Sequence, residues 1–127
     1  MQEKHLFEYA VIRVVPRVER EEFINVGVIL YCPKMKFLQA TYTLTEARLA
    51  AFPAPPDFME MQEHLCMFDH ICRGIKEGGP IALLDAPSRF RWLTATRSTV
   101  VQTSKTHPGL CVDPLETLNR LHQQLVL

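Results

Sequence analysis

This 127-residue sequence lacks long apolar runs and any excess of charge of one sign. No run approaches the roughly 20 apolar residues that cross a bilayer, which excludes a membrane-spanning protein. The first five residues lack the basic start and apolar core of a secretory signal, so a cytoplasmic protein is expected. The 14 Lys and Arg residues balance the 14 Asp and Glu residues. This neutral total is unlike that of typical nucleic-acid-binding proteins.

Common catalytic signatures are lacking as well. The sequence contains no GxGxxG, no GxxxxGK followed by Ser or Thr, no HExxH and no GxSxG. The usual nucleotide-binding, zinc-protease and hydrolase motifs are therefore absent. The four cysteines, Cys32, Cys66, Cys72 and Cys111, form no CxxC pair. They are predicted to be free thiols in a reducing compartment.

Stretches rich in β-branched and aromatic residues predict strands at residues 6–15, 23–32 and 37–43. The short connections between them favour an antiparallel meander. Residues 99–103 are the predicted fourth strand.

Helices are predicted between and after these strands. Thr43 and Glu46 have capping-box spacing for a short helix. Asp57 can cap a second helix over roughly residues 58–76, which the Gly-Gly-Pro sequence at 78–80 ends. Residues 88–93 fit either a helix or a strand.

The last helix has the clearest local signal. Asp113 is an N-cap residue, and Pro114 occupies the first helical position. The predicted helix presents Leu115, Leu118, His122 and Leu125 on one side. Together these patterns predict a single α+β domain over residues 1–127. We expect an antiparallel sheet of about four strands, with helices packed mainly on one face.

The first predicted hairpin carries a candidate ligand site. Antiparallel pairing around a loop near Glu19 sets Arg13 opposite Asn25, and Val11 opposite Gly27. Because glycine has no side chain, the sheet would carry a hollow beside a guanidinium and an amide. Such a hollow suits a carboxylate or a phosphate group.

A simpler interpretation of the same residues needs no ligand. Arg13 would form an ion pair with Glu8 or Glu22, and Gly27 would admit a helix packed against the sheet.

A second candidate is the basic segment 86–112, which contains no acidic residue. Its cations are interleaved with serine and threonine hydroxyls, which can bind phosphate oxygens, and Trp92 could stack on a base. The basic residues in question are Arg89, Arg91, Arg97, Lys105 and His107. The alternative, which the neutral total charge favours, is that the acidic surface of the helix at 58–76 compensates this segment.

Metal binding and nucleophilic catalysis have weaker signals. Cys66 and His70 share a helix face, but two ligands do not complete a structural zinc site, so no metal is predicted. His107 and Cys111 lie in one predicted loop without a feature that joins them as a dyad. His107, Pro108 and Gly109 are predicted to form a turn.

Two stretches together resemble a known family. The first contains Tyr9, Val11, Arg13 and Pro16, followed by Glu22, Asn25, Val26, Gly27 and Val28. The second contains Trp92, Leu93, Arg97, Ser98, Thr99, Val100, Gln102, Ser104, His107, Gly109, Asp113 and Pro114. The combination is similar to the bacterial domain-of-unknown-function 3037 family.

The resemblance implies a small cytoplasmic bacterial protein, with no known activity, catalytic residue or cofactor. It also suggests a protein partner, a HipA-like kinase, and a homodimer is a further expectation. The polar members of both stretches are the predicted ligand-binding residues, and they could face one pocket if the fourth strand joins the meander. These residues are Arg13, Glu22, Asn25, Gly27, Arg97, Ser98, Gln102 and His107.

The leading functional hypothesis is a non-enzymatic accessory or protein-interaction module that binds an anionic group through Arg13, Asn25 and Arg97. The first alternative is an enzyme of nucleotide or phosphate chemistry, with His107 as acid or base and the arginines as electrostatic clamps. A nucleic-acid-binding module is the second alternative.

Overall fold

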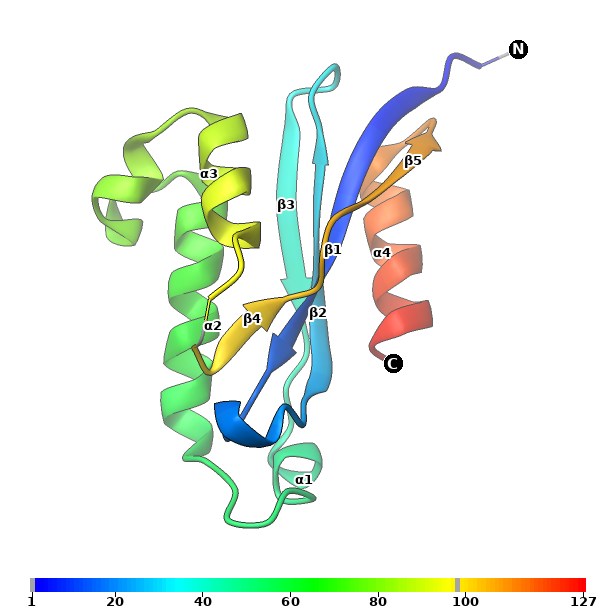
Figure 1. Ribbon diagram of the computed structural model, residues 1–127. Helices are drawn as coiled ribbons and strands as arrows, with labels where there is room; N and C mark the ends of the chain where they lie inside the picture. The colour runs from blue at the N-terminus through cyan, green and yellow to red at the C-terminus, as the bar shows by residue number, and fades with distance from the viewer. Residues whose placement is uncertain (1, 98) are drawn as a thin grey trace.

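The computed structural model describes residues 2–97 and 99–127. One antiparallel sheet separates α2 and α3 from α4 (Figure 1). The strands are β1 (His5–Val14), β2 (Ile24–Cys32), β3 (Phe37–Tyr42), β4 (Val101–Thr103) and β5 (His107–Cys111). The helices are α1 (Glu46–Leu49), α2 (Phe58–Arg73), α3 (Ala86–Thr94) and α4 (Pro114–Leu125), with the 3-10 helices η1 (Val18–Arg20), η2 (Lys76–Gly78) and η3 (Pro80–Leu83). The predicted α+β class is confirmed.

Strand β1 is the centre of the sheet. It pairs with β2 on one side, and β2 pairs with β3 beyond it. On its other side β1 pairs with β5 near its start and with β4 near its end. Ser104 joins these two pairings, because its Oγ accepts a hydrogen bond from the Val11 N–H at 2.9 Å. The Ser104 N–H donates to the Val11 carbonyl oxygen at 2.8 Å, so β4 and β5 act as one interrupted strand.

The predicted turn at His107, Pro108 and Gly109 is wrong, because these residues begin β5. An edge strand tolerates proline, since only one of its sides is hydrogen-bonded. A Cβ at Gly109 would lie 2.5 Å from the ring of Phe7. Glycine therefore lets β5 approach that ring, and the tertiary contact overrides the local turn signal.

The two faces of the sheet carry separate apolar clusters. Ala10, Ile12 and Val14 of β1 pack with residues of α2 and α3. On the other face, Phe7 and Leu118 belong to a smaller cluster beneath α4. Helices α2 and α3 therefore share one face, as expected for helices packed mainly on one side, and α4 covers the opposite face (Figure 1). Among the described residues, no helix is long and apolar enough to cross a membrane.

The helix caps follow the sequence closely at two of the predicted sites. The carboxylate of Asp57 accepts from the Glu60 N–H at the start of α2. Asp113 accepts in the same way at the start of α4. Residues 88–93, which fit either a helix or a strand by sequence, belong to helix α3.

Two predicted helix boundaries are wrong. Thr45, and not Thr43, caps α1, because the Thr43 hydroxyl lies 2.9 Å from Nε2 of His122. Helix α2 ends at Gly74, whose φ of 70° favours glycine, before the Gly-Gly-Pro sequence. Leu115 is exposed on α4.

The register of the first hairpin corrects the predicted hollow. Arg13 pairs with Asn25 as predicted, but Gly27 pairs with Ile12 and not with Val11. The shift arises because a β-bulge leaves Val26 without a partner on β1. A Cβ at Gly27 would lie 2.4 Å from the Thr41 carbonyl oxygen. The space beside Gly27 is thus filled by β3.

We expect Gly27→Ala to lower the free energy of unfolding by about 1–3 kcal/mol, because the added methyl group must displace the backbone of β3. Urea denaturation measures the change. The control is Gln39→Ala on the exposed side of β3, which should change stability by less than about 0.5 kcal/mol. Equal stabilities for Gly27→Ala and the wild type would contradict the close approach.

We also expect His122 to make stability depend on pH. Burial lowers the pKa of His122 below its ordinary value, so the unfolded chain takes up the proton at higher pH than the folded protein. The stabilisation is present above about pH 6.5 and is lost as pH falls through the folded-state pKa. His122→Gln should therefore flatten the loss of unfolding free energy between about pH 7 and pH 5, measured by urea denaturation. The exposed His64→Gln is the control, and an unchanged slope in His122→Gln would refute the expectation.

Candidate functional site

Arg13, Arg97 and Gln102 line one polar cleft where β1 ends and β4 begins. The cleft has a volume of about 500 Å³. Gln102 pairs with Arg13 across the two strands, so their side chains leave the same face of the sheet. Arg97 comes from the connection between α3 and β4. The other lining residues are Val15, Val18, Glu21, Phe23 and Thr96.

Both guanidinium groups of the cleft lie on aromatic rings. The Arg13 guanidinium carbon is 4.1 Å from the centroid of Phe23, and that of Arg97 is 3.8 Å from the centroid of Trp92. A stacked guanidinium is held in place through its face, while its N–H groups remain directed outward along its edge. The cleft therefore contains two cations whose positions are fixed before any ligand arrives.

The predicted ion pair between Arg13 and Glu22 is wrong. Glu22 forms its ion pair with Arg20, in the connection between β1 and β2. Among residues 2–97 and 99–127, neither Arg13 nor Arg97 forms an ion pair. The Nε of Arg13 is also buried without a hydrogen-bond partner in this part of the chain. Among the described residues, Glu21 is the one acid that lines the cleft, so this lining carries a net positive charge.

Among the described residues, the acidic surface of α2 forms no ion pair with the basic segment. Asp69 pairs with Arg73 within the helix at 3.6 Å, and Glu60 lies 4.0 Å from His64, which completes an ion pair only when it is protonated. The balance of charge over the whole chain therefore hides a local excess of positive charge in the cleft.

Asn25 has a structural role beside the cleft. Its amide nitrogen donates to the Leu125 carbonyl oxygen at 3.2 Å. Its own backbone carbonyl accepts from Arg48 at 3.0 Å. These bonds join β2 to the end of α4 and to α1. Asn25 and Gly27, both predicted ligand-binding residues, are not among the residues that line the cleft.

His107 lies away from the two arginines. It is exposed on β5, where its ring centroid is 5.3 Å from that of Tyr9. The expectation that all the predicted ligand-binding residues face one pocket is therefore wrong for His107 and Glu22, as it is for Asn25 and Gly27. Ser98, a further predicted member, lies outside the described residues.

The cysteines offer little nucleophilic chemistry. Burial raises the pKa of Cys72 to about 12. Burial and the neighbouring Cys32 thiol raise the pKa of Cys111, which disfavours a reactive thiolate near His107. Cys66 and His70 share a helix face as predicted, with Sγ and Nε2 3.4 Å apart. In the described part of the chain, no group of three or more His, Cys, Asp or Glu residues is placed to hold a metal ion.

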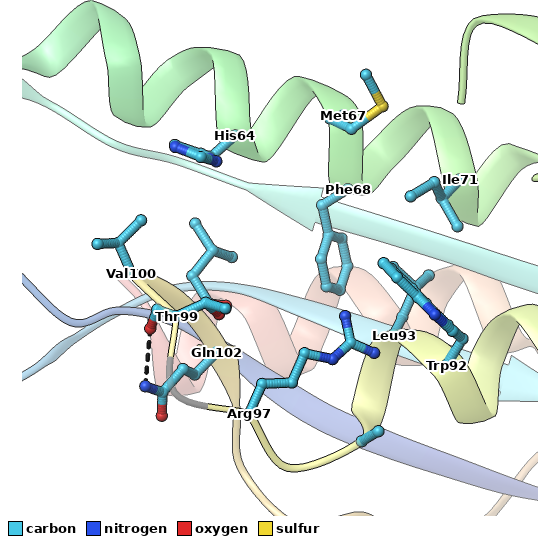
Figure 2. Close-up of a pocket in the computed structure, with 12 residues that line it drawn as sticks. His64, Met67, Phe68, Ile71, Trp92, Leu93, Arg97, Thr99, Val100 and Gln102 are labelled. Carbon is cyan, nitrogen blue, oxygen red and sulfur yellow. Dashed lines mark hydrogen bonds between the residues drawn. The ribbon is translucent and has the colours of Figure 1, made fainter. Parts of the chain in front are cut away.

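An apolar groove that the sequence analysis missed adjoins the cleft (Figure 2). It has a volume of about 210 Å³ and lies between α2, the end of α3 and β4. The groove and the cleft share Arg97 and Gln102. Its apolar lining consists of Met67, Phe68, Ile71, Trp92, Leu93, Ala95, Val100 and Val101. The available signal was the pair Met67 and Ile71, spaced four residues apart beside the apolar residues Leu65, Phe68 and Cys72 of the same helix.

The fold and the cleft define a small α+β domain with a cationic site at the end of its sheet. A family model described as a protein of unknown function, DUF3037, matches residues 9–126. The chain belongs to this family, which confirms the resemblance seen in the sequence. No curated protein matches the chain, and no solved structure matches it.

We expect Arg97→Gln to shift the tryptophan emission to longer wavelength, because the substitution uncovers the ring face of Trp92, the one tryptophan in the chain. The free energy of unfolding should fall by no more than about 1 kcal/mol, the scale of an exposed cation–π contact. Arg91→Gln, on the exposed side of α3, is the control. Identical emission spectra for Arg97→Gln and the wild type would show that the stack is not maintained in solution.

Proposed function

We propose that this protein is a non-enzymatic binding module that holds an anionic group of a protein partner between Arg13 and Arg97. The observation that carries the proposal is that two guanidinium groups from distant segments line one cleft, each stacked on an aromatic ring. Neither is neutralised by a carboxylate among the described residues. Guanidinium groups with free edges recognise carboxylate and phosphate through paired hydrogen bonds.

A small anion alone would bind this cleft weakly. Each charge-assisted hydrogen bond contributes about 1.5–3 kcal/mol, and a dissociation constant of 1 mM corresponds to about 4 kcal/mol. Two such contacts sum to about 3–6 kcal/mol, and the entropy cost of association leaves binding at about millimolar or weaker. Higher affinity requires further contact area, which a protein partner supplies. The HipA-like kinase that the family resemblance suggests is one partner to test.

The lining of the cleft also favours binding over catalysis. The acid or base of the enzymatic alternative, His107, is not among its residues. The arginines stack on rings and stand beside one carboxylate, that of Glu21, with no cysteine or serine among the described lining residues. Such a lining suits recognition of charge.

We expect saturable chemical-shift changes at the Trp92 indole and at the Arg13 and Arg97 side chains when sodium phosphate or sodium acetate is titrated at constant ionic strength. NMR of ¹⁵N-labelled protein measures these shifts. Arg13→Gln and Arg97→Gln should each weaken the binding at least tenfold, because each removes a charge-assisted contact.

Arg91→Gln, an exposed arginine on α3, is the matched control and should bind like the wild type. The proposal fails if neither anion gives saturable shifts in the wild type, or if Arg91→Gln weakens binding as much as the cleft variants do.

A further inference from the structure

We propose that the groove and the cleft form one site for the C-terminal end of a partner protein chain. The partner's last, apolar side chain would enter the groove, and its free carboxylate would bind Arg97. This inference rests on the proposed function and names its ligand.

The groove has the size and lining for one large apolar side chain. Its volume of about 210 Å³ exceeds the roughly 150 Å³ of an engineered cavity that binds benzene. Most of its lining is apolar, and two of its polar side chains are already engaged, since the Gln102 amide donates to the Thr99 carbonyl oxygen at 2.7 Å. The Thr99 hydroxyl in turn donates to the Val101 carbonyl oxygen at 2.6 Å. A hydrocarbon group therefore fits the groove better than a nucleobase, which needs hydrogen-bond partners.

Arg97 sets the charge at the junction of the groove and the cleft. Its side chain extends toward Trp92 and Phe68 in Figure 2, so its positive charge stands directly beside the apolar lining. A ligand that satisfies both features carries an anionic group a few bonds from an apolar group. The last residue of a peptide has this arrangement, because its carboxylate and its side chain share one carbon atom.

The open edge of β4 favours a peptide over a small apolar carboxylate. On one side β4 pairs with β1, where the Val15 N–H donates to Val100 and the Ser104 N–H donates to Val11. Alternate residues of an antiparallel strand face opposite sides, so the N–H groups of Val101 and Thr103 point away from β1. They have no strand partner among the described residues. An extended peptide can pair with such an edge, and Val101 also lines the groove.

The test uses fluorescein-labelled pentapeptides Gly-Ser-Thr-Thr-X with a free carboxylate, where X is Val, Leu, Ile or Phe, and fluorescence anisotropy with the full chain. We expect at least one of them to bind saturably. The same peptide with a C-terminal amide, or with Ser as its last residue, should bind at least tenfold more weakly. Unlabelled octanoate, a small apolar carboxylate, should compete at least tenfold less well than the unlabelled peptide.

Variants of the protein test where the two parts of the peptide bind, the carboxylate at Arg97 and the last side chain in the groove. Arg97→Gln should weaken binding of the free-carboxylate peptide at least tenfold and leave binding of the peptide amide unchanged. Met67→Glu places a negative charge in the groove and should weaken binding of the free-carboxylate peptide at least tenfold. Met35→Glu is the matched control, since both methionines are 46% exposed and Met35 lies in the turn between β2 and β3. Circular dichroism checks that each variant is folded.

The possible outcomes separate this inference from the proposed function. Equal affinity for the free-carboxylate peptide and the peptide amide would overturn the role of the carboxylate. Octanoate that competes as well as the peptide would overturn the peptide as ligand and indicate a small-molecule site. Absence of peptide binding, with phosphate or acetate shifts at Arg13 and Arg97 retained, would overturn this inference alone. Absence of both would overturn both proposals.

Discussion

The exchange of hydrogen bonds between Val11 and Ser104 determines how the rest of the sheet is arranged. A central strand of ten residues must satisfy its backbone groups along both edges, and no other single strand covers its outer edge. The Ser104 hydroxyl takes the place of a backbone carbonyl, so β4 and β5 can share that edge in spite of the break between them. This arrangement sets Gln102 beside Arg13 and brings the chain from α3, with Arg97, to the end of the sheet.

The candidate site depends on aromatic rings as much as on charge. A guanidinium on a flexible stem loses up to about 2 kcal/mol of rotamer entropy when a ligand fixes it. Phe23 and Trp92 hold the two arginines in place before a ligand binds. Part of the rotamer entropy is therefore already lost when the protein folds, and binding costs less. The rings belong to local segments close in sequence to their arginines, and the sheet brings the two segments together.

Much of the fold could be predicted from local signals in the sequence. The caps at Asp57 and Asp113 act within one helical turn, and the strands carry β-branched residues along their length. The pairing of Arg13 with Asn25 followed from the short connection between β1 and β2. The bulge at Val26 could not be predicted, because no local residue pattern marks where the register between β1 and β2 shifts.

The site was less predictable, because its parts come from contacts between distant segments. His107 and Gly109 have the local signature of a turn, but they form a strand through pairing with β1, where Gly109 lies against the ring of Phe7. Trp92 has the residue type of a base-stacking platform, yet Arg97 covers its face. Sequence patterns identified the charged residues, and tertiary packing decided which of them meet.

The neutral total charge of the chain does not determine what it can bind. Coulomb interactions between exposed charges are screened within about 8–10 Å at physiological ionic strength, so a ligand responds to the charges nearest to it. Among the described residues, no acid of α2 forms an ion pair with an arginine of the cleft, and Asp69 is paired with Arg73 on its own helix. Recognition at this site is therefore governed by the two stacked arginines and by the apolar groove that begins beside one of them.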